Sequence, residues 1–142
     1  MRLSCSFFIL CMFFSTLVFS KDFNTYEHQE GEKTARVKTD SGHITGCFED
    51  NKGYVFKIDS DGYARIPTNG RFTIVDSFVA ERGLCTVRTK FLPLEGEAYH
   101  IHMVHGYSCQ TSVYKETQGN EIGVAVEPTQ QKGQACSFYW DR

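Results

Sequence analysis

Apolar and polar residues alternate along most of this chain from Thr34 onward, and this alternation constrains the fold more than any other feature. A period of two is typical of β-strands that bury one face, and turn residues interrupt it about every 8–12 residues. No segment carries the stripe of an amphipathic helix, and the chain is rich in aromatic residues, with 12 Phe and 7 Tyr. The pattern predicts an all-β fold, an antiparallel β-sandwich that is immunoglobulin-like or similar.

The alternation predicts individual strands and the turns between them. Residues 59–62, rich in Asp, Ser and Gly, are expected to close a β-hairpin, and residues 93–96 are expected to close a second one. Residues 34–142 form a single domain in this interpretation, and the polar segment 21–33, which has no apolar period, is a flexible leader. The expected strands are 35–38, 43–48, 54–58, 63–66, 71–80, 84–92, 98–105, 109–115, 122–126 and 135–140.

The first twenty residues have the features of a secretory signal peptide. Arg2 supplies a positive charge, an uncharged apolar run follows over 3–19, and Ser20 precedes Lys21 at the expected cleavage point. We therefore expect a periplasmic or secreted protein with no stable membrane span after cleavage. One alternative is an uncleaved anchor, since the run reaches the shortest length that spans a bilayer. The other, lipidation of Cys11, is disfavoured because large apolar residues precede it.

Cysteines are the second constraint on the fold. The chain has 6, of which two leave with the signal peptide, and the mature chain keeps Cys47, Cys85, Cys109 and Cys136. An even number in an exported domain predicts two disulfides, and the wide spacings argue against a zinc knuckle or a thioredoxin-type motif. Three pairings are possible. The expected hairpin through 93–96 favours Cys85–Cys109, which leaves Cys47–Cys136 by elimination.

The charge of the chain excludes some classes of partner. The formal net charge is −2, and the sequence contains neither a basic block nor an acidic tail. Nucleic acid is therefore an unexpected partner, because nothing resembles a phosphate-neutralising stripe. A polybasic patch that would bind a membrane surface is absent as well.

His100 and His102 are the residues with most potential as metal ligands. On a strand they share one face, opposite the face that carries apolar residues. Two imidazoles at this spacing bind Zn²⁺ or Cu²⁺ if a third ligand is supplied, for which His43 and His28 are candidates. The favoured alternative is that both histidines are exposed to solvent on a polar sheet face and have no function.

Other motifs for catalysis or ion binding are weak. Residues 59–62 are similar to the start of a calcium loop, but the remaining ligands of such a loop are missing. Asp76, Ser77 and His105 are the residue types of a catalytic triad, but no nucleophile elbow accompanies them. No phosphate-binding loop is present. We therefore expect no enzymatic activity, no catalytic residue and no cofactor.

One stretch of the chain resembles a known group of proteins. Its pattern is a cysteine, then F-x-P-x-x-G-x-x-Y, then a glycine and a second cysteine, here Cys85, Phe91, Pro93, Gly96, Tyr99, Gly106 and Cys109. This pattern resembles a loose group of small, uncharacterised bacterial exported proteins and lipoproteins. The resemblance implies a β-sandwich at the cell envelope and implies no activity.

The motif also has a direct physical interpretation. Phe91 and Tyr99 bury aromatic area on one face, Pro93 ends a strand because it cannot donate to the ladder, and Gly96 takes a positive φ in the turn. The sequence as a whole favours an exported, non-enzymatic protein with a binding or structural role at the envelope and an unknown partner. The alternatives are a metal-binding protein that uses His100 and His102, and a secreted inhibitor or effector.

Overall fold

The computed structural model describes residues 23–80, 83–104, 109–116 and 126–138 of the 142-residue chain. The expected signal peptide, His105 and Gly106 lie outside these ranges, as does most of the expected strand 122–126. Among the described residues, no helix has the length and apolar character needed to cross a membrane.

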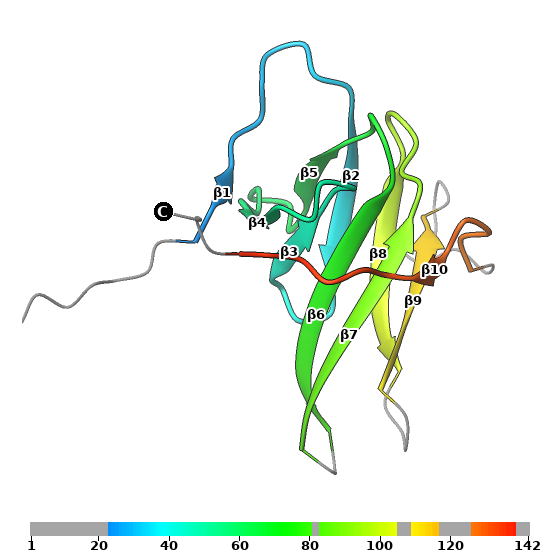
Figure 1. Ribbon diagram of the computed structural model, residues 1–142. Helices are drawn as coiled ribbons and strands as arrows, with labels where there is room; N and C mark the ends of the chain where they lie inside the picture. Colours follow the sequence, from blue (N-terminus) through cyan, green and yellow to red (C-terminus); the bar gives the residue numbers. More distant parts are fainter. Residues whose placement is uncertain (1–22, 81–82, 105–108, 117–125, 139–142) are drawn as a thin grey trace, which may run out of the picture.

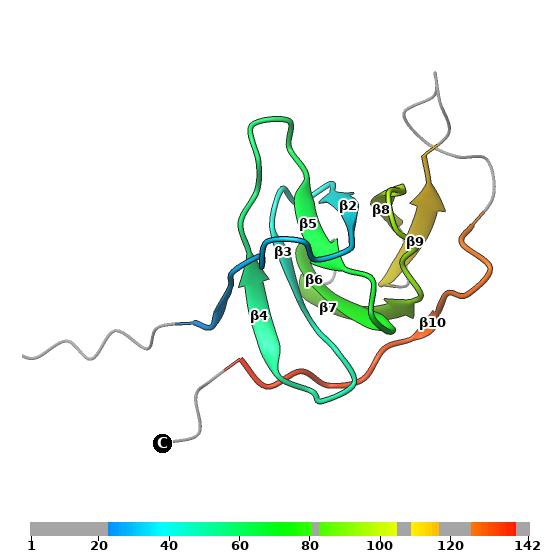
Figure 2. The same ribbon diagram turned by 90° about the horizontal axis from the view of Figure 1, so that it is seen from above.

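Across the described residues, ten strands form two packed sheets, so the fold is the expected β-sandwich (Figure 1). One sheet has the strand order β1-β4-β3-β6-β7-β10 and the other has the order β5-β2-β8-β9. Figure 2 shows these two layers from above. The strands are β1 (Thr25–Tyr26), β2 (Thr34–Thr39), β3 (Ile44–Cys47), β4 (Gly53–Phe56), β5 (Ala64–Pro67), β6 (Phe72–Ala80), β7 (Gly83–Phe91), β8 (Ala98–Val104), β9 (Gln110–Lys115) and β10 (Gln131–Lys132).

Two strand pairs depart from a purely antiparallel arrangement. β1 runs parallel to β4, and β2 runs parallel to β8, with Thr39 opposite Ile101. Parallel neighbours need a long connection between them, and here the chain builds most of the six-stranded sheet before it returns from β2 to β8. The remaining pairs of named strands are antiparallel.

Both expected hairpins are instead crossings from one sheet to the other. The turn at 59–62 forms, with the Gly62 amide donating to the Asp59 carbonyl at 3.0 Å, but only an isolated bridge between Ile58 and Ala64 follows it. Likewise, 93–96 connects β7 of the six-stranded sheet to β8 of the four-stranded sheet, and Gly96 has the expected positive φ of 77°. The alternation identifies a strand's buried face but leaves its partner open.

The core lies between the two sheets. Phe91 on β7 and Tyr99 on β8 are both 0% exposed, and their ring centroids are 5.0 Å apart. Because the two rings come from opposite sheets, their contact joins the layers. The hydrophobic core contains Ala35, Val37, Ile44, Phe56, Ala64, Ile66, Phe72, Ile74, Phe91, Tyr99, Ile101 and Val113.

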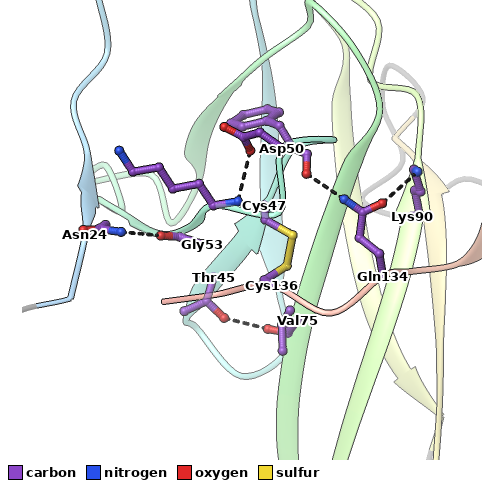
Figure 3. Close-up of a disulfide and its surroundings, with 11 residues drawn as sticks. Asn24, Thr45, Cys47, Asp50, Gly53, Val75, Lys90, Gln134 and Cys136 are labelled. Atoms are coloured by element: carbon purple, nitrogen blue, oxygen red, sulfur yellow. Dashed lines mark hydrogen bonds between the residues drawn. A yellow bond between two sulfur atoms is a disulfide. The ribbon is translucent and has the colours of Figure 1, made fainter. Parts of the chain in front are cut away.

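The two disulfides are Cys47–Cys136 and Cys85–Cys109, the pairing that the sequence favoured. The reason given for it was wrong, because Cys85 lies on β7 and Cys109 lies just before β9, in the other sheet. Figure 3 shows how Cys47–Cys136 fastens the C-terminal segment to β3. Two disulfides are typical of a protein in an oxidising, extracytoplasmic environment.

Both ends of the described chain differ from expectation. Within the expected flexible leader, Asn24 is 2% exposed and its carbonyl accepts the Val55 amide at 2.7 Å, next to the short strand β1. Tyr26 stacks on Phe56 with ring centroids 5.0 Å apart. At the other end, the expected strand 135–140 is represented, in its described part, by an isolated bridge at Ser137. These short pairings give no period-two signal.

Candidate metal centre

The strongest candidate site lies where β2 ends beside β8. The parallel register sets Lys38 opposite His100 and Thr39 opposite Ile101, so Asp40, the next residue, comes alongside His102. Side chains two residues apart on a strand point to the same face, so the even-numbered residues of both strands point away from the core. We call Asp40, His100 and His102 the histidine–aspartate cluster.

The three side chains are in direct contact. His100 Nε2 is 2.6 Å from Asp40 Oδ1, and His102 Nδ1 is 2.7 Å from Asp40 Oδ2. One potential ligand atom from each of the three residues lies within 4.8 Å of the other two. Among the described residues, this is the one group of three histidine, cysteine or acidic side chains with such a spacing.

Asp40 is held in its ionised form. Burial raises its pKa, but the hydrogen bond from the Met103 amide at 2.9 Å, the hydrogen bond with His100 and the electrostatic interaction with both histidines together lower the pKa of Asp40 below its usual value. A carboxylate that is ionised at neutral pH is a ligand for a cation without first losing a proton.

The exposure of the two histidines is unequal. The His102 side chain is 46% exposed, as expected, whereas that of His100 is only 12% exposed, which the sequence did not predict. His100 lies between Lys38 of β2 and Tyr114 of β9 in the ladder, and the Asp40 side chain, 26% exposed, contacts its Nε2. The cluster therefore has a closed side at His100 and an open side at His102.

Two nitrogen atoms of the cluster lack a hydrogen-bond partner among the described residues. His102 Nδ1 is shielded from solvent and makes no hydrogen bond within the described structure, although it lies 2.7 Å from Asp40 Oδ2. A nitrogen lone pair and a carboxylate oxygen at this distance repel each other unless a proton or a metal ion lies between them. His100 Nδ1 is also shielded and has no described partner. Buried polar atoms of this kind call for a physical explanation, and a bound ion is one.

The third ligand is not the one that the sequence suggested. His43 is exposed in the turn after β2, and His28 Nδ1 instead contacts Glu32 Oε2 at 2.9 Å near the N-terminus. Asp40 was not among the ligands considered from the sequence. The β2–β8 parallel pairing brings it to the histidines, and the alternation pattern contains no signal for that pairing.

The other candidate motifs do not form sites. In the 59–62 turn, Asp59 contacts Arg65 at 3.3 Å and Asp61 contacts Arg36 at 3.2 Å, so arginines already neutralise both carboxylates. Ser77 is exposed and hydrogen-bonds Thr86 at 3.0 Å. Asp76 is the neighbouring residue on β6, and adjacent strand residues point to opposite faces.

Asp76 is nevertheless an unusual residue. It is only 4% exposed, and burial, together with the negative charge of Asp40, raises its pKa, although hydrogen bonds from Ser41 and Ser77 oppose the shift. Its Oδ2 atom makes no hydrogen bond within the described residues. A buried carboxyl group therefore lies close to the turn that carries Asp40.

Comparisons with known proteins assign no family to this chain. Searches against protein-family models, curated proteins and solved structures find no match. The function is therefore inferred from the geometry of the histidine–aspartate cluster and from the chemistry of its three side chains.

Proposed function

We propose that this is an exported β-sandwich protein that acts by binding, and that its histidine–aspartate cluster binds a transition-metal ion such as Zn²⁺ or Cu²⁺. The observation that carries the proposal is the convergence of two imidazoles and an ionised carboxylate within 4.8 Å. The two disulfides support export, since such bonds persist in oxidising compartments.

The donor set suits these ions. Imidazole nitrogen and carboxylate oxygen are common ligands of Zn²⁺, and imidazole also suits Cu²⁺. Around a tetrahedral ion with bonds near 2.0 Å, ligand atoms lie about 3.3 Å apart. The contacts of 2.6 and 2.7 Å to Asp40 must therefore open slightly on binding. His102 lies on the exposed side of the cluster, so its ring has room to move outward.

The absence of an assigned nucleophile motif favours binding over catalysis in this proposal. An ion held by three protein ligands would be sequestered, carried or used to attach a partner in the compartment to which the protein is exported. A second candidate is a purely structural cluster. It is favoured by the Met103 amide, which already donates to Asp40 Oδ2 at 2.9 Å and so fastens the end of β2 to β8.

Calorimetric titration of Zn²⁺ and Cu²⁺ into the mature protein distinguishes the two candidates. The protein is purified without a histidine tag, with both disulfides intact, in metal-free buffer. We expect one ion per chain at submicromolar affinity, with release of protons. Binding is lost in the His100→Ala/His102→Ala double variant and in Asp40→Asn.

The matched controls are His43→Ala and His28→Ala, which remove imidazoles that lie outside the cluster. Both variants should bind the ion as tightly as the wild type. Failure of the wild-type protein to bind either ion refutes the metal site and leaves the structural cluster. The metal site is also refuted if the double variant binds Zn²⁺ or Cu²⁺ as tightly as the wild type does.

A further inference from the structure

A cleft opens at the side of the sandwich, between β7 of the six-stranded sheet and β9 of the four-stranded sheet, where β10 lies beside them (Figure 1). Its volume is about 450 Å³, within the range of about 300–1,000 Å³ that small-molecule sites occupy. Residues 86–89, 109–112 and 130–133 line it. None of them belongs to the histidine–aspartate cluster, so the cleft is a separate feature of the molecule.

The lining of the cleft is strongly polar. Among the described residues that line it, Val87 is the one aliphatic side chain, and none carries a carboxylate. The polar side chains are the hydroxyls of Thr86, Thr89, Thr111 and Ser112, the amides of Gln110, Gln130 and Gln131, and the cations of Arg88 and Lys132. A lining of this kind suits a hydroxylated, negatively charged ligand better than an apolar one.

Two buried hydroxyls in the cleft retain a proton to donate. Thr89 and Thr111 are only 4% and 6% exposed, and their hydroxyl oxygens are hydrogen-bonded to each other across the two sheets. Each hydroxyl has one proton, so one of the two donates to the other, and the second proton has no acceptor among the described residues. A buried donor without an acceptor is costly, and an oxygen atom of a ligand in the cleft satisfies it.

Lys132 brings a positive charge to the same place. It lies opposite Thr89 in the ladder between β7 and β10, and directly opposed residues share a face, so Lys132 lies on the side of the sheet that faces β9. Arg88, the residue before Thr89, lines the outer rim. Neither cation forms an ion pair within the described part of the chain. Ammonium and guanidinium groups without a counter-ion bind oxyanions such as carboxylate and phosphate.

We propose that this cleft binds a small saccharide that carries a carboxylate or phosphate group. The two cations bind the oxyanion, and the free threonine proton donates to an oxygen atom of the ligand. The sugar hydroxyls bond to Gln110, Ser112 and Gln131, whose side chains make no hydrogen bond with other described residues. The site uses no residue of the histidine–aspartate cluster, so it stands whether or not that cluster binds a metal ion.

Calorimetric titration of the mature protein, with both disulfides intact and in metal-free buffer, tests the inference with four probes: glucuronate, glucose 6-phosphate, glucose and inorganic phosphate. We expect at least one of the two acidic sugars to bind with a dissociation constant below about 1 mM, and the tighter of the two identifies the oxyanion. Glucose lacks the oxyanion and inorganic phosphate lacks the sugar. Each should therefore bind about 10-fold more weakly than the preferred acidic sugar, or weaker still.

The variant Lys132→Gln should weaken binding of the preferred acidic sugar about 10-fold, because a hydrogen bond to a charged group is lost. The matched control is Lys57→Gln, which removes the same charge from an exposed lysine outside the cleft and should bind as tightly as the wild type. Wild-type affinity in Lys132→Gln overturns the inference, as does a wild-type protein that binds neither acidic sugar. It is also overturned if glucose or inorganic phosphate binds as tightly as the acidic sugar does.

Discussion

Replacing Phe91 by alanine tests whether the two sheets share one core. The Phe91 ring is 0% exposed, lies opposite Phe72 in the β6–β7 ladder and contacts Tyr99 of the other sheet with ring centroids 5.0 Å apart. Removing the ring forfeits about 100 Å² of buried apolar area, or about 2.5 kcal/mol at about 25 cal/mol per Å². A residual cavity of about 70 Å³ adds about 1.7 kcal/mol at about 24 cal/mol per Å³.

The expected loss in the free energy of unfolding is therefore about 4 kcal/mol, a large share of the 5–15 kcal/mol or so that stabilises a typical domain. Urea unfolding of the disulfide-intact, metal-free protein, followed by far-ultraviolet circular dichroism, measures it. Leu94→Ala is the control, because Leu94 is 49% exposed and should change stability by about 0.5 kcal/mol. If Phe91→Ala loses no more stability than Leu94→Ala, the packing of the two sheets through this ring is wrong.

Two further predictions concern the disulfide between the sheets and the N-terminal segment. The double variant Cys85→Ser/Cys109→Ser opens a loop with a sequence separation of 24, so urea unfolding should show a loss of about 3 kcal/mol; no loss would contradict the chain-entropy argument. For Glu32, burial raises the pKa, but hydrogen bonds with Tyr26 and His28 lower it below its usual 4.5. A lowered carboxyl pKa stabilises the fold above 4.5, and this gain is lost as the pH falls through the folded-state pKa. Glu32→Gln should therefore be less stable than the wild type at neutral pH and equal to it in acid, as measured by unfolding across pH; a constant difference would refute this.

The sequence predicted the architecture well where a residue's own neighbours decide its environment. Period-two alternation places Phe91 and Tyr99 inward, and both are fully buried. It does not determine which strands pair, because pairing depends on contacts between distant segments. For that reason 93–96 was interpreted as a hairpin although it connects the two sheets, and the correct disulfide pairing followed from a wrong neighbour relationship.

The candidate site, too, was predictable only where the residues of a single strand determine it. The spacing of His100 and His102 was visible in the sequence, because a strand alone fixes their common face. Asp40 was not, because sixty residues separate it from His100 and only the parallel register of β2 and β8 brings the two together. The burial of His100 was missed for the same reason, since its neighbours Lys38 and Tyr114 come from two other strands.

The position of Asp40 also couples the cluster to the fold. The ladder between β2 and β8 ends at Thr39 and Ile101, and the Asp40 carboxylate continues it by accepting the Met103 amide at 2.9 Å. The group that would bind the ion therefore also fastens the two central strands of the smaller sheet. An ion that binds only the folded protein stabilises it in proportion to the logarithm of its free concentration. If the cluster binds metal, each tenfold rise in free Zn²⁺ above the dissociation constant adds about 1.4 kcal/mol to the free energy of unfolding. A structural cluster without metal affinity predicts no such dependence, so unfolding curves across Zn²⁺ concentrations distinguish the two candidates independently of calorimetry.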